Sequence, residues 1–190
     1  NAFEIPDNKS MELIGSGGRT IDLPDALRLS GTLKISSTGY TLRNGMLSLS
    51  GGLLDVVEDA NIESNITLSV ETTLQIDTSK TLTYSGAVVD IGTSKLNIQG
   101  GGSFINSAVS ALSLDDADSH LVLDNVSVGF VSGSAASNGA KGLEVSVDST
   151  LTNLSMTEKL RLSVDSGKTL TLAESLTVPT QGMDLAGAGT

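Results

Sequence analysis

A short unit recurs along the chain: a polar turn followed by a strand-like run in which every second residue is apolar. The clearest copy covers residues 165–172, Asp-Ser-Gly-Lys-Thr-Leu-Thr-Leu, and residues 77–84, Asp-Thr-Ser-Lys-Thr-Leu-Thr-Tyr, match it closely. A looser copy begins at Val147. Self-similarity of this kind indicates that one short structural unit is stacked many times. This repeat constrains the fold more than any other feature of the sequence.

Apolar residues alternate with polar ones from Gly31 onward. Examples are the pairs Leu33/Ile35 and Leu160/Leu162, and each run is short and bounded by Gly, Ser, Asn or Asp. A period of two with polar partners predicts strands that bury one face. The spacing of an amphipathic helix is almost absent, so the sequence predicts an all-β chain.

The distance between equivalent corners favours one all-β architecture. Asp148 and Asp165 are 17 residues apart, while Asp77 and Asp115 are 38 apart, which is two turns of 19. Parallel coils of roughly 20 residues with several short strands each produce such distances. We therefore predict a single-stranded parallel β-helix (β-solenoid) of eight or nine coils, a rod about 40 Å long at about 4.8 Å per coil.

The domain organisation follows from where this pattern starts and stops. Residues 1–30 contain two of the three prolines, and we interpret them as an N-terminal cap or first coil, because an open solenoid end must be covered. Within them, residues 23–29 could form a short helix, with Pro24 near its first position. Residues 31–190 are the β-solenoid repeats. Residues 131–142 lack apolar periodicity and predict an exposed loop.

One motif favours the alternative of a β-sandwich. Asn44-Gly45 lies between two alternating runs, a pattern typical of a tight β-hairpin. Asn and Gly also serve at solenoid corners, where the backbone needs a positive φ. The sandwich therefore stays open as the second architecture.

Composition excludes several classes of function. The 22 acidic and 11 basic residues give a net charge of −11, which disfavours nucleic acid and anionic lipid as partners. The chain contains no cysteine, which excludes disulfides and thiol catalysis. No stretch approaches 18 consecutive apolar residues, so no membrane span is predicted. The chain begins at Asn1 without a basic and apolar leader, and we expect it to be a mature or excised piece of something longer.

Three phrases carry a resemblance to a known family. Residues 94–107 (SKLNIQGGGSFINS), 118–128 (DSHLVLDNVSV) and 166–178 (SGKTLTLAESLTV) resemble right-handed parallel β-helix repeats of the pectin-lyase-like type. They are especially similar to those of bacterial secreted adhesins and autotransporter passenger regions. The resemblance covers roughly residues 31–190 and implies an extracellular or cell-surface setting.

The function expected from this likeness is structural. We expect a segment of an extracellular adhesin or surface fibre, with no enzymatic activity. The partners would be a host or cell-surface glycan or protein, or further copies in a homo-oligomer or filament formed through the solenoid ends. Residues 183–190 look like an uncapped coil, which favours either a longer solenoid or docking on another copy. The alternative is a polysaccharide-binding or polysaccharide-degrading β-helix module, including the phage tail-spike type.

The densest acidic group is the only candidate metal site. Asp115, Asp116 and Asp118 lie in a corner between two leucines, and pectin-lyase-like proteins often carry acidic clusters with bound calcium. Asp is also a good turn residue, so these three residues form either a structural corner or a weak calcium site. His120, the only histidine, is expected at the surface, since zinc needs more nitrogen or sulfur ligands than this chain offers. No catalytic or other cofactor-binding residue is predicted.

Two further motifs are read as structural. Gly167-Lys168-Thr169 echoes a phosphate-binding loop, but position 162 is Leu rather than Gly and a strand follows. The Thr-x-Thr pairs at 150–152 and 169–171 lie one predicted coil apart, as at the beginning of an ice-binding face. Most other coils do not continue these Thr rows.

Overall fold

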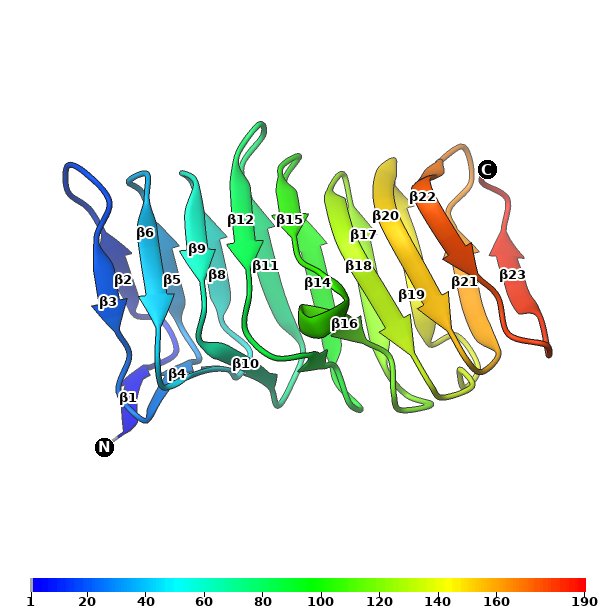
Figure 1. Cartoon of the computed structure of the whole chain (residues 1–190), viewed down its shortest axis with the longest axis horizontal. Helices are drawn as coiled ribbons and strands as arrows, with labels where there is room; N and C mark the ends of the chain where they lie inside the picture. Colours follow the sequence, from blue (N-terminus) through cyan, green and yellow to red (C-terminus); the bar gives the residue numbers. More distant parts are fainter. Residues whose placement is uncertain (1) are drawn as a thin grey trace.

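The computed structural model describes residues 2–190, which form a parallel β-solenoid of about eight coils with about 22 residues per coil. Figure 1 shows the coils stacked side by side from the N-terminal end to the C-terminal end. Every pairing among the described strands is parallel and joins one coil to the next. The predicted solenoid is confirmed. The β-sandwich is wrong, because such a sandwich is built from antiparallel neighbours.

Each coil contributes strands to three faces of the rod. Face 1 begins with β1 (Ala2–Ile5), β4 (Ala26–Leu29), β7 (Met46–Leu49) and β10 (Asn65–Leu68). Face 2 consists of β2 (Ser10–Leu13), β5 (Thr32–Ile35), β8 (Leu53–Val56), β11 (Thr72–Ile76), β14 (Lys95–Gln99), β17 (His120–Asp124), β19 (Gly142–Val147), β21 (Leu160–Val164) and β23 (Met183–Gly187). Face 3 consists of β3 (Thr20–Asp22), β6 (Tyr40–Arg43), β9 (Ala60–Ile62), β12 (Thr81–Tyr84), β15 (Ser103–Ile105), β18 (Ser127–Gly133), β20 (Ser149–Met156) and β22 (Leu170–Thr177).

The cross-section of the rod changes along its length. Two short strands, β13 (Val89–Asp90) and β16 (Leu112–Ser113), follow β10 on face 1, and β16 pairs with the second half of β18. From β18 onward one long strand therefore covers both face 3 and face 1. A single 3-10 turn, η1 (Ala108–Ser110), precedes β16, and no α-helix occurs among residues 2–190.

The core is a set of aliphatic ranks that run along the rod axis. Leu33, Leu54 and Leu74 are partners in register on face 2, and all three are buried. Successive partners on this face are between 19 residues (Leu143 and Leu162) and 25 residues (Leu96 and Leu121) apart. The strands hold their register while the corners absorb the difference in coil length, because an added residue at a corner leaves the alternation of the next strand unchanged.

One aromatic pair fills the middle of this aliphatic core. The rings of Tyr84 and Phe104 stack with centroids 6.0 Å apart. The Tyr84 hydroxyl donates to the carbonyl of Ala87 at 2.6 Å and accepts from the amide of Ile66 at 3.3 Å. Burial raises the pKa of the Tyr84 hydroxyl. These bonds satisfy a polar group that would otherwise cost stability inside the core.

The Asn44-Gly45 motif forms a corner rather than the predicted hairpin. The flanking strands β6 and β7 lie on different faces, and each pairs with other coils. Asn44 has a φ of 57° and Gly45 a φ of 43°, so the motif supplies the left-handed backbone that a sharp corner needs. A Cβ atom at Gly45 would also lie 1.8 Å from the carbonyl oxygen of Pro24 in the preceding coil.

The short helix predicted for residues 23–29 is also wrong. Leu23 is buried in a corner, and β4 follows it, with Leu27 and Leu29 buried against Leu47 and Leu49 of the next coil. The segment forms a strand because Leu27 and Leu29 alternate with polar residues and pack on the neighbouring coil. This packing outweighs the local preference of Pro24 for a helix start.

The predicted N-terminal coil and the predicted loop at residues 131–142 are both part of the solenoid. Residues 2–30 carry β1 to β4 and form the first coil and the start of the second. Residues 131–133 end β18, while residues 134–141 form a mostly exposed connection to β19. None of the helical residues among 2–190 forms a segment long and apolar enough to cross a membrane.

The corner at Gly45 gives a first prediction. Gly45→Ala should lower the free energy of unfolding by about 3 kcal/mol, because a left-handed alanine costs about 1–2 kcal/mol and a clash in a packed site adds about 1–3. Gly167→Ala is the matched control, since Gly167 has a φ of 72° but no heavy atom within 4 Å of an added Cβ. Urea unfolding of both variants measures the difference. Equal losses would contradict the close approach at Gly45.

Candidate functional site along one corner

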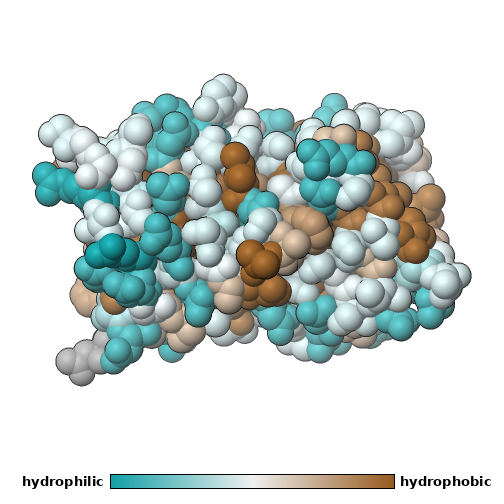
Figure 2. Space-filling model, viewed as in Figure 1, coloured by the Kyte–Doolittle hydropathy of each residue, from teal (hydrophilic) through white to brown (hydrophobic). Residues whose placement is uncertain are grey.

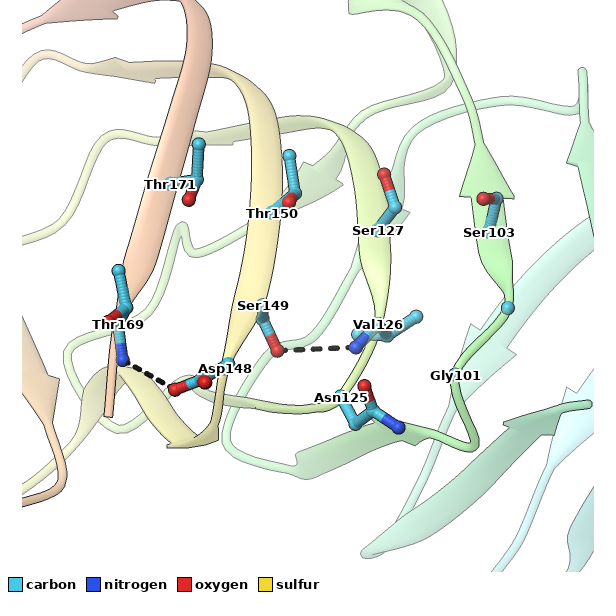
Figure 3. A pocket seen from close by; sticks show the side chains of 11 residues that line it. Gly101, Ser103, Asn125, Val126, Ser127, Asp148, Ser149, Thr150, Thr169 and Thr171 are labelled. Atoms are coloured by element: carbon cyan, nitrogen blue, oxygen red, sulfur yellow. Dashed lines mark hydrogen bonds between the residues drawn. The ribbon is translucent and has the colours of Figure 1, made fainter. Parts of the chain in front are cut away.

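A groove of about 510 Å³ follows the corner where face 2 turns into face 3. It crosses four successive coils, and Figure 3 shows its residues arranged in two rows. The corner row consists of Gly101, Asn125, Asp148 and Thr169. The strand row consists of Ser103, Ser127, Thr150 and Thr171.

The strand row is an array of hydroxyl groups in register. Thr81 pairs with Ser103, Ser103 with Ser127, Ser127 with Thr150, and Thr150 with Thr171. Neighbouring hydroxyls are therefore about 4.8 Å apart along the rod axis, the spacing of adjacent strands. Figure 3 shows these side chains side by side on successive strands.

The hydroxyl groups of this row are free to bind a ligand. Within residues 2–190, no protein group forms a hydrogen bond with the hydroxyls of Ser103, Ser127, Thr150 or Thr171. Other hydroxyls join coils instead, such as Ser36, which donates to Glu12 at 2.5 Å, and Thr38, which donates to Glu58 at 3.0 Å. The groove thus presents both donors and acceptors in a line.

Hydrogen bonds between coils hold the floor of the groove. The carboxylate of Asp148 accepts from the amide of Thr169 at 2.8 Å. The hydroxyl of Ser149 accepts from the amide of Val126 at 3.3 Å and donates to the carbonyl of Val147 at 2.8 Å. Figure 3 shows the Asp148–Thr169 and Ser149–Val126 bonds as bridges between neighbouring coils. The groove is therefore a fixed polar surface, suited to binding a neutral hydroxylated ligand.

The sequence identified this row only in part. It aligned Thr150 with Thr169, whereas the structure pairs Thr150 with Thr171, because the amide of Thr169 belongs to the corner and bonds to Asp148. Ser127 and Ser103 continue the row, and the Thr-x-Thr pattern does not include them because they are serines. A signal existed, because each residue of the row directly precedes an inward apolar residue of face 3, such as Phe104 after Ser103.

The three aspartates of the predicted calcium site lie in one corner but make separate bonds. Asp115 accepts from Ser113 and from Ser134 (2.8 Å), and the bonds from these two hydroxyls hold its pKa low against the opposing effect of burial. Asp116 caps the amide of Asp118 at 2.8 Å, and Asp118 accepts from Asn138 at 3.1 Å.

These bonds are those of a structural corner. In the described part of the chain, no three Asp, Glu or His side chains are grouped so that they could hold a metal ion. A calcium ion at Asp115, Asp116 and Asp118 stays a prediction of the sequence.

His120 lies at the start of β17 and contacts the next coil. Its Nε2 atom lies 2.9 Å from Oε2 of Glu144, and its side chain is mostly buried. On the preceding coil its partner in register is Lys95, which forms an ion pair with Glu71 at 3.2 Å. The contact of His120 with Glu144 therefore joins two coils on face 2, next in register to the Lys95–Glu71 ion pair.

The carboxylate of Asp55 on face 2 carries an electrostatic cost. It lies in register between Lys34 and Gln75, and one of its oxygens is buried without a hydrogen-bond partner in the described residues. Burial first, and then the negative charge of Asp77, raise the pKa of Asp55 above its ordinary value of 3.8.

This shift predicts a pH-dependent gain in stability for Asp55→Asn. The folded chain holds the Asp55 proton more tightly than the unfolded chain, so the stability from this group is lost as pH rises above 3.8. Asp55→Asn should therefore raise the free energy of unfolding at pH 7, and the gain should shrink as pH falls toward 3.8. Urea unfolding across this range measures it, with the exposed Asp165→Asn as control. A gain that does not change with pH would contradict this cause.

Comparison with known proteins found no match among protein-family models, functionally curated proteins or solved structures. The class of the protein, a β-solenoid repeat protein, therefore rests on its fold. An adhesin or autotransporter origin has no identified relative to support it.

Proposed function

We propose that this chain is a structural β-solenoid segment of an extracellular adhesin or surface fibre. The observation that supports this proposal best is the uninterrupted stacking of face 2, where nine strands from β2 to β23 pair in register. In a solenoid each coil contacts only its neighbours, so added coils lengthen the rod without a larger core. Such a rod holds a binding element away from the surface that anchors it.

The exterior of the rod suits an extracellular scaffold. Ion pairs join successive coils, as in Arg43–Asp22 at 2.8 Å and Lys80–Glu58 at 2.6 Å. Hydrogen bonds from Arg43 and Lys80 hold the pKa of Asp22 and Glu58, respectively, below their ordinary values. Each exposed pair contributes little on its own, because water and salt screen its charges. The net charge of −11 keeps the surface soluble, and the chain holds its fold without cysteine.

Surface exposure in the source cells tests this function. An antibody raised against the folded chain should label intact cells, and brief protease treatment of those cells should remove the label. A cytoplasmic protein of the same cells serves as the control and should be labelled only after lysis. Labelling of this chain only after lysis would overturn the proposal.

A second candidate function, binding of a neutral linear polysaccharide, is favoured by the hydroxyl row. Its groups repeat about every 4.8 Å along the rod, about the length of one hexose in an extended chain. Asp148 and the acidic surface disfavour acidic polysaccharides. Stacking on an aromatic side chain does not contribute, because the groove has no aromatic lining.

Glycan binding can be tested with matched variants. Ser127→Ala combined with Thr150→Val removes two adjacent free hydroxyls, and the loss of about 1 kcal/mol for each should weaken binding by about tenfold or more. Thr67→Val on face 1 is the control, because it removes an exposed hydroxyl far from the groove. Screening on an array of neutral and acidic glycans, followed by calorimetry, measures the effect. Equal affinity of both variants would exclude the groove as the site.

A further inference from the structure

The chain contains two Asn-Gly dipeptides, and they differ in how tightly the backbone around them is packed. The first is Asn44-Gly45, at the corner between β6 and β7, and the second is Asn138-Gly139, in the connection from β18 to β19. Both asparagines and both glycines are exposed. A difference in their reactivity would therefore come from the packing of the backbone rather than from the sequence of the dipeptide or its access to water.

An asparagine followed by a glycine can react with its own backbone. The backbone nitrogen of the glycine attacks the side-chain carbonyl carbon, Cγ, of the asparagine, and the new C–N bond closes a five-membered succinimide ring. The bond from Cγ to Nδ2 breaks, and Nδ2 leaves as ammonia with the proton of the attacking nitrogen. Water then opens the ring to aspartate or isoaspartate. Glycine favours this reaction because it has no side chain to shield its nitrogen.

Ring closure requires the glycine nitrogen to reach Cγ, so the peptide group between the two residues must be able to rotate. A misplacement of about 1 Å at the reacting atoms can slow a reaction about a hundredfold. The contacts of this peptide group with neighbouring coils therefore decide whether a folded Asn-Gly dipeptide reacts.

The corner at Asn44-Gly45 is held by the coils on both sides. A Cβ atom built on Gly45 would lie 1.8 Å from the carbonyl oxygen of Pro24 in the preceding coil. The side-chain amide of Asn44 donates to the carboxylate of Asp22 at 2.6 Å, also in the preceding coil. In the following coil, the hydroxyl of Ser64 donates to the backbone carbonyl of Asn44. Rotation of this peptide group would disturb contacts with both neighbouring coils.

The backbone at Asn138-Gly139 is packed less tightly. An added Cβ atom on Gly139 would meet no heavy atom within 4 Å. The peptide group that must rotate uses its carbonyl in a local bond, from the amide of Lys141 at 3.1 Å, within the same exposed turn. The bonds that tie Asn138 to the preceding coil come from its backbone amide to Ala117 at 2.7 Å and from its side chain to Asp118 at 3.1 Å.

The surroundings of this turn are also open to water. In Figure 1 the yellow-green connection from β18 to β19 lies at the lower edge of the rod, and Figure 2 shows mainly hydrophilic and intermediate residues (teal and white) along that edge. Exposed turns with few packed contacts open at a small cost in free energy. The turn at Gly139 can therefore reach the geometry of ring closure while the rod stays folded.

We infer that Asn138 is a site of spontaneous deamidation in the folded protein, whereas the fold protects Asn44. The reaction changes the net charge from −11 to −12, because one neutral amide becomes one carboxylate. It also replaces the donor that binds Asp118 with a second carboxylate, and two carboxylates at this distance repel each other. Deamidation therefore releases the connection, residues 134–141, from the acidic corner as the protein ages.

Incubation of the folded chain at mildly alkaline pH measures the reaction. A more acidic species should accumulate in ion-exchange chromatography, and peptide mapping by mass spectrometry should place aspartate and isoaspartate at position 138. The rate at Asn138 should exceed the rate at Asn44 by about a hundredfold. In the chain unfolded in guanidinium chloride the two rates should become similar, because the contacts that hold Gly45 are gone.

Two substitutions at Asn138 separate the reaction from its effect. Asn138→Gln keeps a side-chain amide but would have to close a six-membered ring, which forms far more slowly, so this variant should lose the acidic species. Asn138→Asp reproduces the charge of the product. Trypsin should cut after the exposed Lys141 about fivefold faster in Asn138→Asp than in Asn138→Gln, because one hydrogen bond that restrains the connection is lost. Circular dichroism checks that both variants are folded.

Two results would overturn the deamidation site. They are a rate at Asn138 no higher than the rate at Asn44 in the folded chain, and an acidic species that persists in Asn138→Gln. Equal rates of trypsin cleavage in Asn138→Asp and Asn138→Gln would overturn the release of the connection.

Discussion

The stacking of one coil on the next is the interaction on which the structure depends. Each coil places aliphatic side chains over those of the preceding coil, as Leu33, Leu54 and Leu74 do on face 2, and the parallel ladder holds them in register. No single coil could bury these side chains alone. The same requirement explains the aliphatic composition, since a thin core accommodates ranks of Leu, Val and Ile better than large rings.

The fold could be predicted from the sequence because the alternation of apolar residues reports directly on this stacking. The corners were harder to predict, because their chemistry is shared with other turns. Asn44-Gly45 has the two positive φ angles that a tight hairpin turn also needs, yet it joins two faces, and only the pairing partners of β6 and β7 distinguish the two cases. The helix prediction for residues 23–29 was wrong for a related reason. The residues against which Leu27 and Leu29 are buried lie a full coil away in the sequence, so the local pattern does not show them.

The hydroxyl row of the groove could also be predicted only in part from the sequence. Its hydroxyls are outward residues next to inward ones, so the alternation predicts their orientation but not their register. Corner length sets the register, and a shift of two residues separates Thr169, whose amide bonds to Asp148, from Thr171, which continues the row. The acidic corner at Asp115 depends on partners that the sequence does not identify, since the hydroxyls of Ser113 and Ser134 both donate to the carboxylate of Asp115. A calcium ion at this corner stays a prediction.

The change in cross-section at β18 has a consequence for how such a chain can grow in evolution. Coils before β18 use separate strands for face 3 and face 1, whereas β18, β20 and β22 each continue as one strand across both faces, with a shift in the pairing of β20 and β22 between Leu151 and Asn153. A duplicated coil finds matching strands on every face when it lies beside coils of the same outline. Gene duplication could therefore lengthen either half of the rod from its own coils, whereas a coil copied from one half into the other would need a junction like the one at which β18 pairs with both β15 and β16.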